Sequence, residues 1–143
     1  MQMIRDLLNS KKREIISISP DASVFDALVL MAEKEIGAVL VVRDDKLVGI
    51  MSERDYARKV ALQGKSSKEI TVKEIMTEKV LIIESSSQIE DCMAIMTSKR
   101  IRHLPVFENG NLIGVISIGD VVKTVIEEKE FTISQLEHYI TGR

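Results

Sequence analysis

The sequence predicts a mixed α/β (α+β) fold made of two similar repeats, each with the element order β-α-β-β-α. Residues 49–55 and 114–120 share one pattern: glycine, two apolar residues, serine, two variable residues and aspartate. The two segments stand 65 residues apart, and the same spacing aligns the apolar and charged positions before them without a gap. A polar stretch at 63–68 indicates a linker between them. We therefore expect one repeat in 1–68 with an N-terminal helix, and another in 69–143 with a C-terminal helix.

The first repeat begins with a short strand and a helix. The strand is expected at 15–18 and ends at Ser19 and Pro20, which are turn residues. Ser23 or Asp21 can cap the helix that follows. Apolar residues recur in this helix at helical spacing: Val24, Ala27, Leu28, Met31 and Ala32.

Two further strands are expected to form a hairpin. Residues 38–42 are an uninterrupted, valine-rich apolar run, which is typical of a strand buried on both faces. The polar residues 43–46 turn the chain, and 47–51 returns beside the first strand. In the second repeat Asn109 and Gly110 are a stronger turn signal. Helices are expected after Ser52 and Ser117, and an extra C-terminal helix is expected over 131–140.

The repeated motif has a structural and a functional interpretation, and the residues alone leave both open. A serine followed three positions later by an acid is close to a capping box at a helix N-terminus. The same corner also offers free backbone amides to a phosphate. Asp55 and Asp120 could accept hydrogen bonds from two neighbouring ribose hydroxyls. Gly49 and Gly114 have no Cβ, so a ligand could approach the strand end closely.

The two repeats resemble paired cystathionine-β-synthase (CBS) domains, the regulatory unit also called a Bateman module. The resemblance covers essentially the whole chain and rests on five segments: 15–20, 36–42, 49–55, 102–106 and 114–120. It implies that the short sheets of the two repeats face each other around a pseudo-twofold axis and leave two clefts. Such clefts bind adenosine-containing ligands, namely AMP, ADP, ATP, NAD or S-adenosylmethionine.

The resemblance also assigns ligand-binding roles to individual residues. The family's ribose-binding aspartate matches Asp55 and Asp120. Its serine or threonine near the phosphate or ribose matches Ser52 and Ser117. In the first repeat the base pocket is expected at Ile18, Ser19, Ile36, Gly37 and Ala38. In the second repeat it is expected at Ile83, Arg102, His103, Leu104 and Pro105.

The repeats differ in charge beside the aspartates. The first carries Arg54 and Arg58, and we expect these guanidinium groups to hold ligand phosphates. The second has Gly119 and Lys123 at the matching positions, so the two clefts need not be occupied equally. Lys59 is expected on a solvated helix face.

Other reactive side chains have plainer interpretations. His103 is either a structural group or a ligand contact that makes binding depend on pH, and both remain open. Cys92 lies on an apolar helix face, where core packing is expected. Lys11, Lys12 and Arg13 are expected in a solvated loop.

Composition argues against several classes of protein. The 20 basic and 22 acidic residues leave a net charge of −2, without the basic excess of a general nucleic-acid binder. One cysteine and two histidines form no catalytic triad or metal cluster, and no Walker or dinucleotide motif occurs. The longest apolar run, 36–42, is too short to span a membrane, and no signal peptide is recognised.

These observations together predict a cytoplasmic regulatory sensor that is not an enzyme and uses no catalytic cofactor or metal. It would bind an adenine nucleotide (AMP, ATP or NAD) in the clefts and pass the occupancy to an unknown effector protein by a conformational change. A homodimer is expected, with the apolar faces of helices 24–32 and 89–96 as hypothetical contact surfaces. No nucleic-acid or membrane partner is expected. The alternative is a ligand-independent module that dimerises or docks onto a partner.

Overall fold

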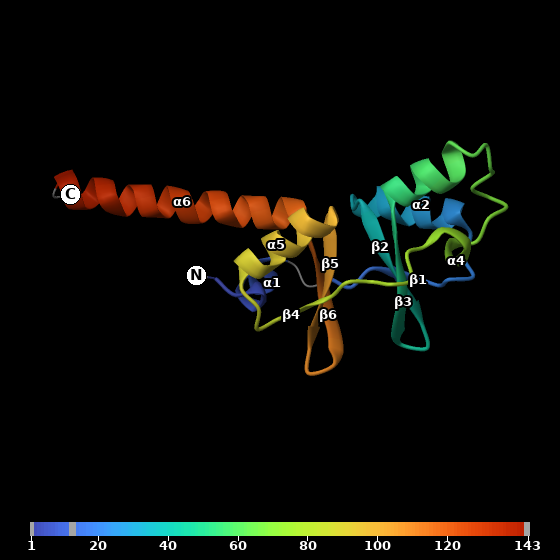
Figure 1. Ribbon diagram of the computed structural model, residues 1–143, viewed down its shortest axis with the longest axis horizontal. Coiled ribbons are helices and arrows are strands. Elements are labelled where there is room, and N and C mark those ends of the chain that lie inside the picture. The colour runs from blue at the N-terminus through green and yellow to red at the C-terminus, as the bar shows by residue number, and fades with distance from the viewer. Residues whose placement is uncertain (1, 12–13, 142–143) are drawn as a thin grey trace. The chain divides into compact units, whose positions relative to one another are not determined.

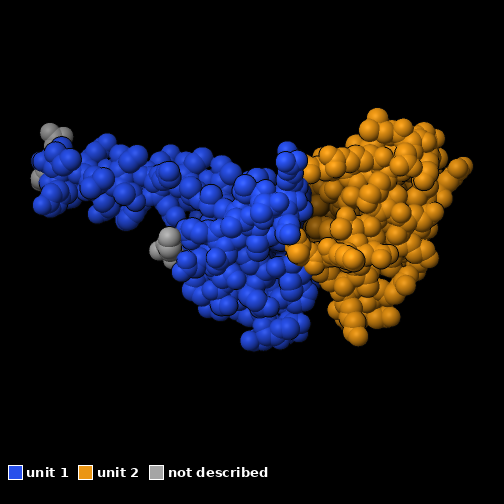
Figure 2. Space-filling model, in the orientation of Figure 1, with its two compact units in different colours: residues 1–13, 82–143 blue, residues 14–81 orange. Residues whose placement is uncertain are grey.

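The chain folds into two compact units (Figure 2). Each unit contains one three-stranded sheet. The computed structural model describes residues 2–11 and 14–141. Unit 1 comprises residues 1–13 and 82–143, and unit 2 comprises residues 14–81. The chain therefore starts in unit 1, forms the whole of unit 2, and then returns to unit 1.

Unit 2 contains the sheet of the first repeat (Figure 1). Its elements are β1 (Ser17–Ile18), α2 (Val24–Lys34), β2 (Ala38–Arg43), β3 (Lys46–Ser52), α3 (Glu53–Tyr56), the π-helical segment η1 (Ala57–Ala61) and α4 (Val72–Ile75). The strand order is β1-β2-β3, with β1 parallel and β3 antiparallel to the central strand β2. Ala38 pairs with Ser52, and Ile18 pairs with Val41.

Unit 1 repeats this architecture. Its elements are α1 (Ile4–Ser10), β4 (Ile83–Glu84), α5 (Ile89–Lys99), β5 (His103–Glu108), β6 (Asn111–Ser117) and α6 (Ile118–Thr141). The strand order is β4-β5-β6, in which His103 pairs with Ser117 and Ile83 pairs with Val106. Each of these pairs stands 65 residues after its counterpart in unit 2, so the predicted mixed α/β fold of two like repeats is confirmed.

Local signals set the helix ends and the turns much as the sequence predicts. Of the two possible caps for α2, Ser23 is the one used, because its Oγ accepts a hydrogen bond from the Asp26 amide at 3.0 Å. The hairpin turns contain left-handed residues: Asp44 and Asp45 in one unit, Asn109 and Gly110 in the other. Cys92 lies fully buried in the core of unit 1, as expected.

The leading helix of each repeat packs in the unit of the other repeat. α1 begins the first repeat in sequence, yet Ile4, Leu7 and Leu8 are buried in the core around the second sheet. α4 begins the second repeat, yet Val72 and Ile75 are buried in the core around the first sheet. The boundary between 68 and 69 remains a prediction about the sequence repeats, whereas the compact units are divided differently because of this exchange.

The exchange explains Gly49 and Gly114, which we expected to give a ligand room at the strand end. A Cβ on Gly49 would lie 2.6 Å from Sδ of Met76, which follows α4. A Cβ on Gly114 would lie 2.9 Å from Cδ2 of Leu8 in α1. The expected reason for these glycines was therefore wrong. At each of them, a side chain from the exchanged helix segment occupies the space that a Cβ would need.

The C-terminal helix also differs from the prediction. Residues 131–140 do not form an extra helix, because they continue the single 24-residue helix α6. No proline interrupts the segment, and its one glycine, Gly119, lies in the first turn, where it does not break the helix. Within unit 1, α6 extends well past the sheet and the other helices (Figure 1).

Candidate functional site

Each unit has a corner where the last strand of its sheet ends and a helix begins. In unit 2 this corner joins β3 to α3, and the Glu53 amide donates to the Gly37 carbonyl at 3.0 Å. In unit 1 it joins β6 to α6, and the Ile118 amide donates to the Arg102 carbonyl at 2.8 Å. The start of the central strand is thereby tied to the start of the helix in both units. We call these places the unit 2 corner (Gly37, Ala38, 52–55) and the unit 1 corner (102–103, 117–120).

In the unit 2 corner, Asp55 and Ser52 form a reciprocal capping box. The Asp55 amide donates to Ser52 Oγ at 3.1 Å, and Asp55 Oδ2 accepts from the Ser52 amide at 2.9 Å and from Ser52 Oγ at 3.1 Å. The Asp55 side chain is only 14% exposed. The structural interpretation of the motif is therefore realised here, with the carboxylate held in a fixed position.

The unit 1 corner reproduces this arrangement 65 residues later. The Asp120 amide donates to Ser117 Oγ at 3.2 Å, and Asp120 Oδ2 accepts from the Ser117 amide at 2.9 Å. One oxygen of this half-buried carboxylate, Oδ2, therefore caps the helix.

A lysine neutralises each aspartate, but the two lysines come from different places. Lys59 Nζ lies 3.2 Å from Asp55 Oδ1 and donates to the Ile75 carbonyl at 2.8 Å. Lys11 Nζ donates to Asp120 Oδ2 at 2.7 Å and to the Val115 carbonyl at 3.1 Å.

Two expectations about these lysines were wrong. Lys59 does not lie on a purely solvated face, because it ties Asp55 to the carbonyl at the end of α4. Lys11 is not a solvated loop residue, because α1 of the exchanged segment brings it to the unit 1 corner. Lys12 and Arg13 lie outside the described residues.

The surroundings of the unit 1 corner shift two pKa values. Partial burial favours the protonated carboxyl of Asp120, but hydrogen bonds from Lys11 and Ser117 outweigh it and hold the pKa below its usual range. Burial lowers the pKa of His103, and the positive charges of Arg102 and Lys11 lower it further, although Asp120 opposes them. The fold therefore favours an ionised Asp120 and a neutral His103.

The structure places Ile18 and Ser19 away from the unit 2 corner. Ile18 pairs with Val41, whereas the corner lies beside Ala38, about 10 Å along the central strand. In unit 1, Ile83 pairs with Val106 and lies in the core. The structure thus does not bring these three residues to the corners, and their role in a base pocket stays a prediction.

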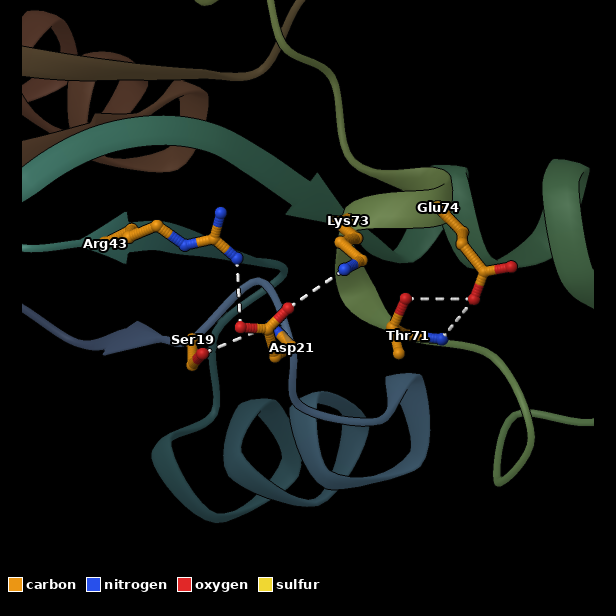
Figure 3. A network of polar contacts seen from close by, with 6 residues as sticks. All are labelled: Ser19, Asp21, Arg43, Thr71, Lys73 and Glu74. Atoms are coloured by element: carbon orange, nitrogen blue, oxygen red, sulfur yellow. Dashed lines mark hydrogen bonds and ion pairs between the residues drawn. The ribbon is translucent and has the colours of Figure 1, made fainter.

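Ser19 instead belongs to a polar network that fastens α4 to the first sheet (Figure 3). The Asp21 amide donates to Ser19 Oγ at 3.1 Å, and the Asp21 carboxylate pairs with Arg43 at 2.9 Å and with Lys73 at 3.1 Å. The hydrogen bond from Lys73 and the charge of Arg43 lower the pKa of Asp21. This network therefore holds α4 beside β2 within unit 2.

The remaining predicted residues lie at or near the corners with differing exposure. Ile36 and Gly37 are half-buried just before β2, and Ala38 is buried. Leu104 and Pro105 are buried in β5 next to His103. Arg54, Arg58 and Arg102 are exposed. Their proposed contacts with a base or phosphate are untested and remain predictions.

Sequence reasoning missed Lys11 as a corner residue. No local pattern marks it, because its partner Asp120 lies 109 residues further along the chain. Lys59 carried a detectable signal, since an acid and a lysine at i and i+4 on a helix commonly pair.

In the part of the chain that the structure describes, no group of three or more histidine, cysteine, aspartate or glutamate side chains is placed to hold a metal ion. Nor is any helix in that part both long enough and apolar enough to cross a membrane.

The sequence of the chain matches the family model for the CBS domain twice, over residues 4–62 and 72–127. The chain belongs to the CBS domain family. Each match contains one corner motif, and the predicted resemblance is confirmed. The first match also includes α1 and the second includes α4. Each match therefore contains a helix that packs in the compact unit of the other match.

Two relatives that are similar along most of their length are named for their CBS domains. The mitochondrial CBS domain-containing protein CBSX3 of Arabidopsis thaliana is 38% identical over 97% of this chain and 72% of its own. The solved structure of a candidate signal-transduction protein with CBS domains from Burkholderia ambifaria MC40-6 is 52% identical with a TM-score of 0.86. That alignment covers 88% of this chain and 95% of the other.

Two other matches bear on ligands and on enzymes. The crystal structure of CBSX2 in complex with AMP is 27% identical with a TM-score of 0.72, over 90% of this chain and 99% of that one. Inosine-5'-monophosphate dehydrogenase of Methanocaldococcus jannaschii is 34% identical, but the match spans only 22% of the enzyme. The similarity to an enzyme is thus confined to a segment of it.

Proposed function

We propose that this CBS-domain protein is a cytoplasmic regulatory sensor that binds an adenosine-containing ligand (AMP, ADP, ATP or NAD) at its corners. It catalyses no reaction itself and passes ligand occupancy to an effector protein by a conformational change. A ligand can drive such a change only through its different affinities for the two states. The AMP complex of CBSX2 supports the ligand class.

One observation carries the proposal: both units hold a half-buried aspartate in the same capping box at a strand end. In unit 1 the box occupies Asp120 Oδ2, and in unit 2 it occupies Asp55 Oδ2. Each carboxylate has a second oxygen, Oδ1, and that of Asp55 meets a lysine that is itself 43% exposed. Ribose hydroxyls can donate to these second oxygens.

Titration of AMP into matched variants tests the proposal. Asp55→Asn and Asp120→Asn keep the shape of the side chain but remove its charge, and each should weaken binding at its own corner about tenfold. Asp91→Asn is the control, because Asp91 also closes a capping box with the amide of Gln88, but in α5 and outside the corners. Unchanged AMP affinity in both corner variants would reject the ribose assignment.

The competing function is a module that docks or dimerises without a ligand. Thermal unfolding with AMP, ATP, NAD and S-adenosylmethionine distinguishes the two. A ligand at one hundred times its dissociation constant should stabilise the protein by about 2.7 kcal/mol. No shift with any of the four would favour the docking module.

A homodimer is also part of the proposal. The burial of side chains in α2 and α5 limits which of their residues could form its contact surface. The apolar stripes of α2 and α5 are largely used inside their own units, where Val24, Met31 and Met96 are buried. Of the expected contact surfaces, Phe25 and Val29 of α2 and Met93 of α5 remain exposed. Crystal structures of hexameric CBS-CP12 proteins, 28% identical over 85% of this chain, support self-association of the fold in general.

A further inference from the structure

The distal part of α6 carries apolar side chains that the rest of unit 1 does not cover. Every residue from 129 to 141 is exposed, and the CBS match ends at 127. A helical stretch of this length is marginally stable in water by itself. The family fold therefore does not account for this segment, and a packing partner would stabilise it.

The exposed side chains follow a heptad pattern. One seam of the helix alternates spacings of four and three residues: Val122, Ile126, Lys129, Ile133, Leu136 and Ile140. The five apolar members are between 49% and 79% exposed. Isoleucine stands at one type of core position, and valine, lysine and leucine stand at the other. This pattern fits another helix of the same periodicity.

We propose that α6 pairs in an antiparallel coiled coil with α6 of a second copy of this chain. With the two helices centred on residue 131, each isoleucine of one copy faces a different core residue of the other. Val122 then meets Ile140 of the second copy, Ile126 meets Leu136, and Lys129 meets Ile133. In a parallel pair Lys129 would face Lys129, so like charges would meet in the seam.

The flanks of the seam favour the same orientation. On one flank lie Lys123, Glu130 and Glu137. Antiparallel pairing places Lys123 of each copy beside Glu137 of the other, and it places the two Glu130 side chains beside each other. On the other flank Val125 comes to lie beside Tyr139 of the second copy. Two Lys123–Glu137 pairs and two Val125–Tyr139 contacts thus stand against one Glu130–Glu130 repulsion in this self-pairing register.

The base of α6 provides a place for the end of the second helix. A groove of about 720 Å³ opens there, and its lining includes Val122, Ile126 and Arg102. The antiparallel register brings Ile140 and Leu136 of the second copy to the first two of these residues. The groove is therefore continuous with the seam.

The charge of the segment argues against a membrane surface as the partner. Between residues 126 and 141 there are four glutamates and one lysine. Amphipathic helices that bind anionic lipid are basic on their polar face. A second copy, with its own Lys123 to match Glu137, fits the chemistry better.

Disulfide formation in the full-length protein tests the orientation. Chains with Ile126→Cys and chains with Leu136→Cys should each fail to cross-link alone and should cross-link to each other when mixed. Cross-linking of either chain alone would overturn the antiparallel register, and no cross-linking in the mixture would overturn the pairing. Phe131→Cys, on the opposite face, is the collision control. Burial raises the pKa of the native Cys92 thiol to about 11, so Cys92 stays unreactive.

Sedimentation equilibrium tests the pairing independently. Ile133→Glu should weaken self-association at least tenfold, whereas Phe131→Glu, at a 67% exposed site off the seam, should change it less than about twofold. Lys129→Leu should tighten it at least tenfold, an effect that misfolding cannot imitate. Equal effects of the two glutamate variants, or no tightening with leucine, would overturn the proposal.

Discussion

The two corners share a motif and a capping box, yet they obtain their compensating charge in different ways. In unit 2, Lys59 stands one helical turn after Asp55 on the same segment. In unit 1 the position matching Lys59 is Thr124, which is buried, and the cation is Lys11 from the exchanged segment. A repeated motif therefore preserves the local hydrogen bonds, while the wider environment of each copy is free to diverge.

The two units also differ in the neighbours that the exchanged segments bring to Gly49 and Gly114. The neighbours of Gly49 include backbone, which moves less easily than a side chain. Gly49 lies against Met76 and against the Thr77 carbonyl, where the Cβ distance would be 3.0 Å. Thr77 also pairs with Ile50 through two backbone hydrogen bonds, at 2.9 and 3.0 Å. The neighbour that a Cβ on Gly114 would meet is a side chain alone. Unit 2 should therefore tolerate added volume less well at this position.

The largest expected effect comes from adding that volume. Gly49→Ala should lower the free energy of unfolding by about 2–3 kcal/mol, because backbone on one side leaves little room to relax. Gly114→Ala should cost about 1 kcal/mol, since the Leu8 side chain can shift. Urea denaturation measures both.

Gly119→Ala is the control for these two variants. Its Cβ would meet only Ser117 Oγ, at 3.6 Å, and alanine favours the helix by up to about 1 kcal/mol. Equal losses at Gly49 and Gly114 would contradict the contrast between the two neighbours.

An intermediate effect is expected from the lysines. Lys11→Met should lower the free energy of unfolding at pH 7 by about 1 kcal/mol, because the lysine joins distant segments at a half-buried carboxylate. Lys59→Met should cost about 0.5 kcal/mol, as is typical of an i, i+4 pair. Denaturant titrations of the two variants give the order, and a larger loss for Lys59→Met would reverse the comparison.

The lysine at the unit 1 corner also gives an expected acid dependence. Because the pKa of folded Asp120 lies below its unfolded value of 3.8, its contribution is present above that pH and is lost as the pH falls through the lowered pKa. Lys11→Met should therefore lose less stability than the wild type on acidification. Parallel acid curves for the two proteins would show that Lys11 does not set this pKa.

The smallest effect concerns His103, whose counterpart in unit 2 is Ala38. Because burial lowers the pKa of folded His103 below 6.5, its stabilising contribution is complete above that pH and decreases as the pH falls towards the lowered pKa. His103→Gln should reduce the slope of stability against pH just below pH 6.5 and leave that slope unchanged above pH 7.5. Thermal melts across this range measure the difference, and a steeper curve in the variant would contradict the predicted sign.

Sequence alone was informative wherever a local pattern determines structure. The apolar periodicity marked the central strands and the two 11-residue helices, and the 65-residue spacing was reproduced in the strand registers. The motif predicted the capping boxes because serine and aspartate three residues apart bond to each other's backbone. It also located the corners, although a ligand role for their residues is a proposal.

Contacts between distant segments escaped that reasoning. The pairing of Ile18 with Val41, away from the corner, depends on where β1 docks along β2. The role of Gly49 depends on a methionine brought in by α4. Local periodicity predicts neither the register of a two-residue strand nor the docking of a four-residue helix, because such short elements have too few residues to show a repeating pattern.

The sequence by itself determined the two repeats, their elements, the helix caps and the CBS resemblance, since each depends on residues close together in the chain or on a fixed spacing. Only the tertiary structure decided which sheet receives each leading helix and that Lys11 meets Asp120. Both outcomes follow from burial of α1 and α4 in the opposite repeat's core. That burial carries Lys11 to a carboxylate 109 residues away.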